Sequence, residues 1–279
     1  MNKDISVVLC ARNEESRITK ALESIALANP AEIIVVDGNS TDKTVEIARR
    51  YTDKVIVSQE GSLTADRQIG IDATSFDLIA MIDADHRIEP DTLQNLAKDL
   101  DEFNFDVVQA QLGIEPTSFW TKAENQAFAV FLNHPGPKNM IGTAPAMYRA
   151  KLFEEFGFDS TVTKNKDDAD FFYRLSLRPE FTFGTGRTFV WQEHFASFTD
   201  YVKKFFWYGK GDSEFCRKHP RRAFGMLFHL FIRYPVLRPI KAITLGHFKA
   251  IPYFIVCGLT RGTSVLYHLT KFAVSSERA

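Results

Sequence analysis

The N-terminal third of the chain alternates short apolar runs with segments of helical periodicity. The runs are rich in β-branched residues and bounded by polar ones, which is typical of buried strands. The predicted strands are 5–10, 32–36, 54–58 and 77–82, and the predicted helices between them are 16–28, 44–50 and 64–73. This alternation predicts an open, largely parallel α/β sheet whose ligands bind beyond the carboxyl ends of its strands.

The central stretch is less regular. It predicts strands at 107–112 and 143–148, helices at 119–132, 151–156 and 167–178, and a loop at 133–142. The fold class is therefore α/β, with a mixed, mostly parallel central sheet flanked by helices and followed by a helical extension.

Charge divides the chain unevenly. Residues 1–202 carry 20 Lys and Arg against 32 Asp and Glu, whereas residues 203–279 carry 14 against 3. We predict an α/β catalytic domain over 1–202 and a basic, aromatic-rich helical region over 203–279. Interleaved basic and apolar side chains favour a membrane surface as the partner of this region. No nucleic-acid-binding motif accompanies the charge, so we expect no nucleic acid partner.

The C-terminal region contains apolar runs that basic residues and prolines interrupt. A spanning helix needs about twenty largely apolar residues, so interfacial helices fit better than a full span. The stretch 239–260, with two lysines, stays open as a span. A packed helical subdomain or an oligomer interface would explain the same pattern.

Composition and cysteine spacing exclude several classes of protein. Hydrophobic residues make up 45% and charged residues 25%, which excludes a disordered or disulfide-stapled chain. The three cysteines are widely spaced and form no zinc pattern, so a reducing compartment is expected. No signal peptide is visible at the N-terminus.

Asp83-Ala84-Asp85 directly follows an apolar run, so it is delivered to the ligand-binding edge of the sheet. Two carboxylates at this spacing can hold a divalent cation through oxygen ligands. The spacing alone is weak, because Asp99/Asp101 and Asp168/Asp170 match it too. A strand-end turn with solvated acids explains the same residues.

Three further clusters carry candidate chemistry. Asp37 ends the second predicted strand and can accept hydrogen bonds from a ligand, whereas Ser40 to Asp42 suit capping of the next helix. Asp167 to Asp170 open a helix, where acids interact favourably with the helix dipole, or one of them is a general base. His194 follows an apolar stretch and is either structural or a metal ligand.

Taken together, these clusters resemble family-2 glycosyltransferases of the GT-A fold, in the family's order over most of 5–200. The segments that carry the resemblance are Ser6–Glu15, Ile34–Thr44, Asp66–Gly70, Asp83–Asp85, Gly142–Arg149 with Phe156–Asp159, and Asp167–Leu175.

The resemblance implies an inverting, metal-dependent enzyme. It would move one sugar from a UDP- or GDP-linked donor to a lipid-linked or cell-surface glycan acceptor. Donor contacts are implied for Ala11, Arg12, Asn13, Glu14, Asp37, Arg67 and Asp83. The metal, Mn²⁺ or Mg²⁺, is implied at Asp85 and Asp83, and His194 is similar in placement to a late His that completes this site in some relatives. Asp168 is implied as the catalytic base, with Gly142, Thr143 and Asp167 on the acceptor side.

Several positions depart from the family pattern. Many members carry a second acid where this chain has Gly38, Gln68 stands for an Asn, and Asp167 stands for a Glu. The Gln-x-x-Arg-Trp motif of processive synthases is absent, which favours a single transfer. Tyr208–Gly211 and the basic stretch 217–222 resemble membrane-associated members that act on lipid-linked acceptors. We therefore expect the protein at the cytoplasmic face of the cell membrane, as a peripheral or monotopic protein.

Two other functions compete with this one. A glycosyltransferase-like protein that has lost activity would bind without catalysis, although Asp83, Asp85 and Asp168 are retained. A sugar-nucleotide transferase of related fold usually has a glycine-rich, Arg-containing loop after its first strand, and Ala11–Glu15 contains no glycine.

Overall fold

The computed structural model describes residues 2–162, 165–193 and 197–276. The chain forms two compact units. The sheet unit comprises Met1–Gly113, His134–Thr163 and Asp167–Glu193, and the helical unit comprises Ile114–Asn133, Lys164–Lys166 and His194–Ala279. The predicted domains, 1–202 and 203–279, stay a prediction. The helical unit includes residues 114–133 in addition to the C-terminal region.

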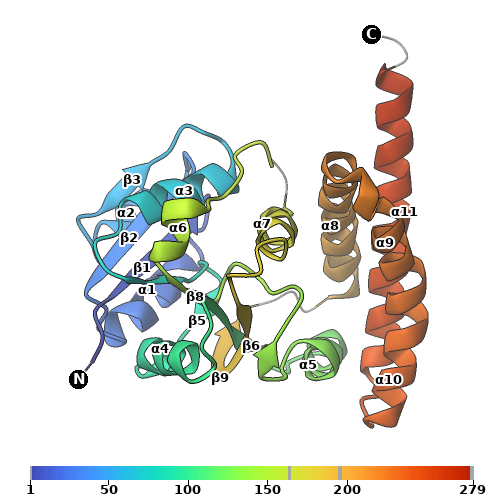
Figure 1. The fold of residues 1–279 in the computed structure, drawn as a ribbon, viewed down its shortest axis with the longest axis horizontal. Helices are drawn as coiled ribbons and strands as arrows, with labels where there is room; N and C mark the ends of the chain where they lie inside the picture. Colours follow the sequence, from blue (N-terminus) through green and yellow to red (C-terminus); the bar gives the residue numbers. More distant parts are fainter. Residues whose placement is uncertain (1, 163–164, 194–196, 277–279) are drawn as a thin grey trace. The chain divides into compact units, whose positions relative to one another are not determined.

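Parallel strands form one half of the sheet (Figure 1). β1 (Ile5–Ala11) pairs with β2 (Glu32–Asp37) on one side and β4 (Leu78–Met81) on the other, and β2 pairs with β3 (Val55–Val57). Every residue of β1 is buried, as expected for a central parallel strand covered on both faces. Ala11 is in register with Asp37, so the turns after β1 and β2 begin side by side.

The other half of the sheet is mixed. β8 (Ala146–Arg149) runs antiparallel to both β4 and β6 (Val107–Gly113), and β9 (Phe183–Gln192) runs parallel to β6. The short strands β5 (His86–Arg87) and β7 (Gly136–Pro137) pair antiparallel with β9. The strand order is β3-β2-β1-β4-β8-β6-β9-β5, and the predicted mixed sheet is confirmed.

Helices of the sheet unit connect these strands. They are α1 (Ile18–Leu27), α2 (Thr44–Ala48), α3 (Leu63–Asp72), α4 (Thr92–Glu102), α6 (Lys151–Glu155) and α7 (Asp167–Leu175). α3 lies close to the sheet because it has no side chain at Gly70, where a Cβ would come within 2.4 Å of Val8 Cγ1.

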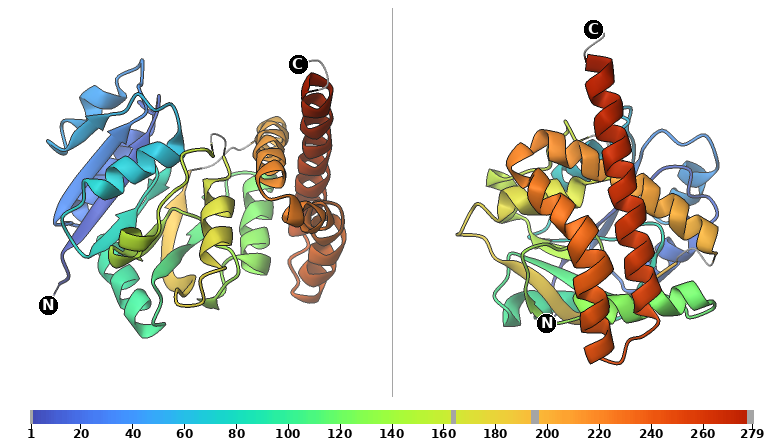
Figure 2. Two further views of the ribbon diagram at one scale, coloured as in Figure 1. Left: turned by 45° about the horizontal axis from the view of Figure 1, so that its top comes forward. Right: turned by 90° about the vertical axis from the view of Figure 1, so that its right-hand side faces the viewer.

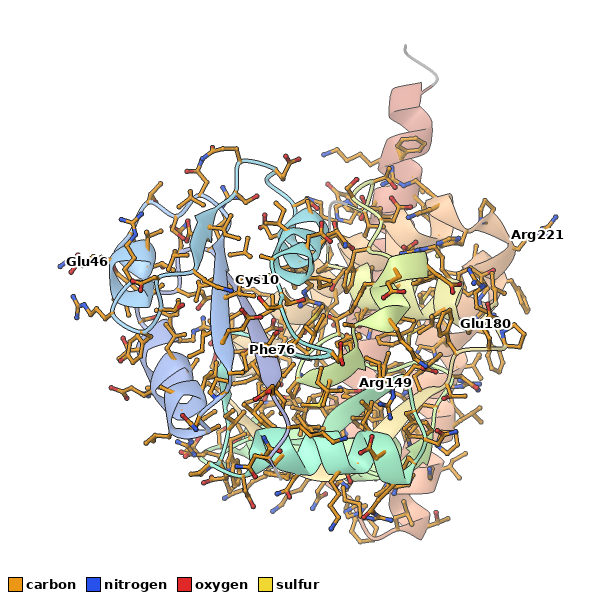
Figure 3. All side chains as sticks on the ribbon, turned by 60° about the vertical axis from the view of Figure 1, so that its left-hand side comes forward. Cys10, Glu46, Phe76, Arg149, Glu180 and Arg221 are labelled. Atoms are coloured by element: carbon orange, nitrogen blue, oxygen red, sulfur yellow. The ribbon has the colours of Figure 1, made fainter. Side chains whose placement is uncertain are left out.

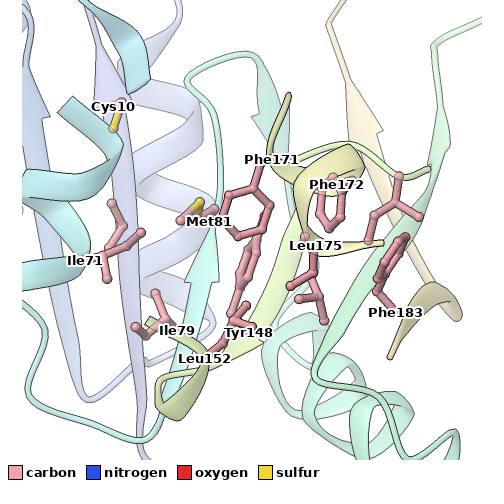
Figure 4. Packing of buried hydrophobic residues seen from close by; sticks show 14 of the residues in the cluster. Cys10, Ile71, Ile79, Met81, Tyr148, Leu152, Phe171, Phe172, Leu175 and Phe183 are labelled. Atoms are coloured by element: carbon pink, nitrogen blue, oxygen red, sulfur yellow. The ribbon is translucent and has the colours of Figure 1, made fainter. Parts of the chain in front are cut away.

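The core of the sheet unit anchors α7. Phe171, Phe172 and Leu175 on α7 are fully buried and pack with Tyr148 of β8 and Met81 of β4 in one cluster (Figure 4). Burying each such side chain contributes about 1.5–3 kcal/mol. The packing therefore fixes the position of the acidic first turn of the same helix.

Four elements lie outside the sequence prediction: α4, β5, β7 and β9. α4 has the apolar spacing of an amphipathic helix, with Leu93, Leu96 and Leu100 buried. β9 was harder to predict because glycine and polar residues interrupt its apolar pattern. The predicted loop 133–142 also contains the two-residue strand β7.

Asp99, which matches the Asp-x-Asp spacing with Asp101, has a structural role. Its Oδ2 accepts hydrogen bonds from the backbone N–H of Arg187 and of Thr188, each at 2.8 Å, and from the Thr188 hydroxyl. Asp101 forms ion pairs with Lys3 and Arg149. Asp99 thus ties α4 to β9, and Asp101 ties the same helix to the N-terminal segment and to β8.

The helical unit consists of α5 (Phe119–Phe131), α8 (Phe198–Lys218), α9 (Pro220–Phe228), the π-helix η1 (His229–Leu237), α10 (Arg238–Thr244) and α11 (Ala250–Ser276). Figure 2 shows α11 in red as one long helix beside the orange segment that runs from α9 to α10. The π-helical turns contain Pro235, whose ring removes a backbone donor from the ladder.

The core of the helical unit is aromatic. Tyr201 and Phe205 of α8 pack with Tyr253 and Phe254 of α11 and with small residues of α5. The segment 239–260 is divided between α10 and α11. Among the described residues, none of the helices combines the length and the hydropathy that crossing a bilayer requires.

A buried ion pair joins α8 to α11. Asp212 accepts hydrogen bonds from Arg261 Nε and Nη2, both at 2.9 Å, and Lys166 Nζ lies 3.5 Å from the same carboxylate. Burial alone would raise the pKa of Asp212, but the cations outweigh it and hold that pKa below its usual value. Arg261, one of the basic residues that interrupt the apolar runs of the C-terminal region, is therefore buried inside the helical unit.

Candidate functional site

Two turns are joined at the carboxyl ends of β1 and β2. The backbone N–H of Thr41 donates to Asn13 Oδ1 at 2.9 Å, and the backbone N–H of Asn13 donates to Ser40 Oγ at 2.8 Å. Asn13 and Asn39 have positive φ angles of 55° and 63°, a conformation that asparagine tolerates better than most residues. The predicted donor-binding residues Ala11 to Glu14 and Asp37 are thus brought together.

Asp37 is completely buried at this junction. Its two carboxylate oxygens accept hydrogen bonds from the backbone N–H and the hydroxyl of Ser40, at 2.8 and 2.5 Å. Asp37 therefore holds the turn that follows β2. Its predicted contact with the donor nucleoside stays a prediction.

Asp83 and Asp85 follow β4 with His86 beside them. One ligand atom from each of the three lies within 4.8 Å of the others. The side chain of Asp83 is 35% exposed and that of Asp85 is 23% exposed, so both are open to a ligand. Gln192 Nε2 donates to Asp85 Oδ2 at 3.0 Å and orients that carboxylate.

His86 is buried, and its hydrogen bond shows which ring nitrogen is the acceptor. The backbone N–H of Asp83 donates to His86 Nδ1 at 3.0 Å, so a neutral ring carries its proton on Nε2. Nε2 lies 3.7 Å from Asp85 Oδ1. A metal-bound histidine needs a free lone pair and usually donates from its other nitrogen. His86 therefore positions the turn, and the carboxylate oxygens are the ligands that fit Mg²⁺ or Mn²⁺.

Arg67 of α3 lies between two carboxylates. Its Nη1 forms an ion pair with Asp167 Oδ2, and its Nη2 lies 3.3 Å from Asp83 Oδ1. Burial alone would lower the pKa of Arg67, but the Asp167 and Asp83 carboxylates outweigh it and raise that pKa. Arg67 is only 4% exposed, and a buried charge of this kind needs such partners. Its predicted direct contact with the donor stays a prediction.

The acceptor-side residues meet Arg67 through Asp167. Thr143 Oγ1 donates to Asp167 Oδ2 at 3.0 Å, and Tyr148 Oη donates to the Thr143 carbonyl at 2.7 Å. The backbone N–H of Gly142 donates to Gln109 Oε1 at 2.9 Å. Thr143 is thus linked to Arg67 through Asp167, whereas the hydrogen bond of Gly142 is to Gln109 on β6.

The acids in the first turn of α7 differ in burial. Asp167 and Asp170 are buried, and Asp170 Oδ2 accepts a hydrogen bond from Arg174 Nε at 2.7 Å. Asp168 is half-buried, and its Oδ1 accepts from the backbone N–H of Ala169 at 2.7 Å. Of the three, Asp168 is the least buried, and its predicted role as the base stays a prediction.

Gln68, which stands where the family pattern has Asn, also has a structural role. Its Oε1 accepts a hydrogen bond from the backbone N–H of Phe158 at 3.0 Å, which ties α3 to the segment after α6. His194, predicted as a further metal ligand, lies outside the described residues.

Comparison with known proteins identifies the family. The model of glycosyl transferase family 2 matches residues 6–172 of this chain. The chain belongs to glycosyl transferase family 2. Its curated relatives include the glycosyltransferase GlyA of Streptococcus pneumoniae, which is 26% identical over 179 residues, 56% of this chain and 26% of GlyA. The poly(ribitol-phosphate) beta-N-acetylglucosaminyltransferase TarS of Staphylococcus aureus is 28% identical over 113 residues, 37% of this chain and 20% of TarS.

Solved structures share the fold of this family-2 chain. The mannosyltransferase PcManGT from Pyrobaculum calidifontis, in complex with GDP-Man and Mn²⁺, has a TM-score of 0.69 at 15% identity, covering 96% of this chain and 88% of that one. Residues 1–349 of S. aureus TarS give a TM-score of 0.53 at 16% identity, covering 98% and 92%. The predicted fold, the family and the classification as a glycosyltransferase are confirmed. The matches to GlyA and TarS span about a quarter of those proteins or less.

Three residues of the site were missed by the sequence analysis. His86 adjoins the acidic pair in sequence, so its place beside Asp83 and Asp85 could be predicted. Its hydrogen bond with the backbone of Asp83 could not. Gln192 reaches Asp85 from β9, a strand that the sequence analysis did not predict. Asp66 lies on α3 within the Asp66–Gly70 segment, and only the structure shows that it is buried beside Gly38.

We expect the change Arg67→Met to destabilise the sheet unit by about 3–5 kcal/mol, because it leaves Asp167 buried without its cation. The control is Arg50→Met, which removes an exposed ion pair with Glu46 and should cost about 0.5 kcal/mol or less. Urea unfolding measures both. Adding Asp167→Asn to Arg67→Met should recover part of the loss, and an Arg67→Met protein as stable as Arg50→Met would contradict the assignment.

Proposed function

We propose that this chain transfers one sugar from a UDP- or GDP-linked donor to an acceptor, with inversion at the anomeric carbon and with a divalent metal. The observation that carries the proposal is the arrangement around Arg67. One buried guanidinium holds an acid of the Asp83/Asp85 pair and an acid of the acceptor side, so donor and acceptor machinery are built as one site. A similar fold in PcManGT was solved with GDP-Man and Mn²⁺, which supports the donor class.

Asp83 and Asp85 would hold Mn²⁺ or Mg²⁺. The bound ion would neutralise charge on the donor diphosphate and help it to depart. Gln192 orients Asp85 and Arg67 orients Asp83, so the two carboxylates are held in position before a donor arrives. Such preorganisation lowers the cost of binding a polyanion to an acidic protein surface.

Asp168 is the proposed general base. As the acceptor oxygen forms its bond to the anomeric carbon, its proton passes to the Asp168 carboxylate, and the bond from carbon to the diphosphate oxygen breaks. The nucleoside diphosphate leaves with that electron pair, and a single displacement inverts the centre. With a lipid phosphate as acceptor the attacking oxygen is already ionised, and no base is needed.

The helical unit supports an acceptor at a membrane. Six apolar side chains spaced mostly four residues apart are exposed along α9, η1 and α10, and we call them the apolar stripe. The apolar stripe is Phe224, Phe228, Ile232, Val236, Ile240 and Ile243, with exposures of 82, 41, 41, 46, 55 and 53%. Four residues are close to one turn of a segment that is part α-helix and part π-helix, so the side chains follow one line.

Basic side chains accompany the apolar stripe. Arg221, which points away from α9 in Figure 3, is exposed, as are Arg233 and Lys241. The sequence from 215 to 276 contains no Asp or Glu. Apolar and cationic groups on one segment fit the boundary of an anionic bilayer. We propose that the protein binds the cytoplasmic face of the cell membrane there and glycosylates a lipid-linked or surface glycan acceptor.

The metal site is tested with Asp85→Asn, against Asp101→Asn, an exposed acid of the Asp99/Asp101 pair. Wild type and Asp101→Asn should gain thermal stability from UDP or GDP with Mn²⁺, and Asp85→Asn should lose the metal-dependent part of the gain. Ligand at a hundred times its dissociation constant stabilises by about 2.7 kcal/mol. A full gain in Asp85→Asn would rule out this metal site.

Asp168→Asn should bind the donor normally but turn it over about 10²- to 10⁴-fold more slowly, because the acceptor proton has no carboxylate to receive it. Donor hydrolysis, in which water replaces the acceptor, measures this without a known acceptor. Asp91→Asn, an exposed acid at the start of α4, should leave the rate unchanged. Equal rates of donor hydrolysis for Asp168→Asn and wild type would remove Asp168 as the base.

Flotation with vesicles tests the membrane surface. The triple variant Phe228→Glu/Ile232→Glu/Ile240→Glu should bind phosphatidylglycerol-containing vesicles more than about tenfold more weakly than wild type, because it loses apolar burial and adds repulsion. The control Leu27→Glu/Leu177→Glu changes exposed apolar residues of the sheet unit and should bind normally. If wild-type protein binds neither anionic nor neutral vesicles, the membrane proposal is overturned.

A further inference from the structure

Asp66 is a buried carboxylate with unused hydrogen-bonding capacity. It lies in the first turn of α3 and is 6% exposed, and its Oδ1 has no hydrogen-bond partner among the described residues. Burial raises the pKa of Asp66, and hydrogen bonding to Ser58 only partly offsets this. An unpaired buried acceptor is costly, so its retention needs an explanation beyond packing.

The position of Asp66 points to a ligand. Its Oδ2 lies 2.9 Å from the point where a Cβ on Gly38 would stand, so the carboxylate fills the space of the missing side chain. Gly38 follows Asp37 at the carboxyl end of β2, the edge where such sheets bind ligands. The Cβ and Cδ atoms of Arg12 lie 3.4 and 3.5 Å from the same point. Arg12 is exposed, so the space beside Gly38 is bordered by a side chain at the surface of the sheet unit.

The neighbouring acid, Asp37, differs from Asp66 in its hydrogen bonding. Both oxygens of Asp37 already accept hydrogen bonds from Ser40, whereas Asp66 Oδ1 accepts none from the described residues. Only one of positions 38 and 66 can place a carboxylate in this space, because a side chain at 38 would displace Asp66. A carboxylate from α3 therefore occupies the space beside Gly38.

We propose that Asp66 selects the nucleobase of the donor by accepting hydrogen bonds from N–H groups on the edge of the base. This inference rests on the proposed use of a nucleotide sugar. An ionised carboxylate only accepts, so it favours uracil, with its ring N–H, and guanine, with two adjacent N–H groups. Cytosine and adenine present a bare ring nitrogen at the corresponding edge, which a carboxylate repels.

Binding of UDP, GDP, CDP and ADP, each with Mn²⁺, tests the inference. The four share ribose and diphosphate, so the ratios of their dissociation constants report the base alone. Asp66→Asn should weaken binding of the preferred diphosphate about 10- to 100-fold, since a hydrogen bond to a charged group is lost. The ratio between the dissociation constants of CDP and of the preferred diphosphate should become smaller. Asp72→Asn, an exposed acid on the same helix, should bind as wild type does.

Two further readouts separate recognition from a structural role. Asp66→Asn removes an unpaired buried charge, so the ligand-free protein should be at least as stable as wild type. In Asp66→Ala, the second change Gly38→Asp should restore part of the base preference, because the two positions share one space.

The outcomes are distinguishable. A wild type that binds one diphosphate while Asp66→Asn keeps its affinity and its ratios overturns this inference alone. A loss of ligand-free stability with unchanged ratios assigns Asp66 to packing and also overturns it. A wild type that binds none of the four overturns the proposed function and this inference with it.

Discussion

The candidate site depends on one buried cation. Arg67 lies between Asp83, at the end of β4, and Asp167, at the start of α7, and so connects segments that are far apart in the chain. A guanidinium in a nearly water-free position requires anionic partners, and those carboxylates in turn require it. The two acids outnumber the one cation, and the more exposed of them is Asp83. The remaining negative charge is therefore concentrated where a divalent cation would bind.

This arrangement suits an acidic protein that handles a polyanion. Direct binding of a diphosphate by a surface rich in carboxylates would be repulsive, and a bridging cation reverses the sign of the interaction. Different carboxylates would then bind the two ends of one ligand. Asp83 and Asp85 would hold the metal, and Asp66 would accept from the base. Aromatic packing holds the acidic first turn of α7 in position, because Phe171 and Phe172 anchor that helix in the core of the sheet unit.

The basic residues of the helical unit have two different roles. Arg261 is buried and fully paired with Asp212, so it helps to hold α8 and α11 together. Arg233 and Lys241 are exposed near the apolar stripe and supply the charge of the proposed membrane surface. The sequence alone does not distinguish these roles, since all three are basic residues within apolar surroundings. Whether an acid packs opposite decides whether a cation is structural or available to a partner.

The sequence by itself determined the strands β1 to β4, the helices between them and the order of the family's motifs. Apolar runs and polar turns are local features, and a buried strand or a capped helix is specified locally. It also placed Asp83 and Asp85 at the edge of the sheet, although β9 and its Gln192 were missed because glycine and polar residues interrupt the apolar pattern there. Only the tertiary structure decided that Arg67 joins Asp83 to Asp167, that His86 accepts from the backbone, and that Asp66 fills the space beside Gly38. These contacts join residues whose distance in space follows from strand pairing and helix packing, and periodicity along the chain carries no information about which side chains then meet.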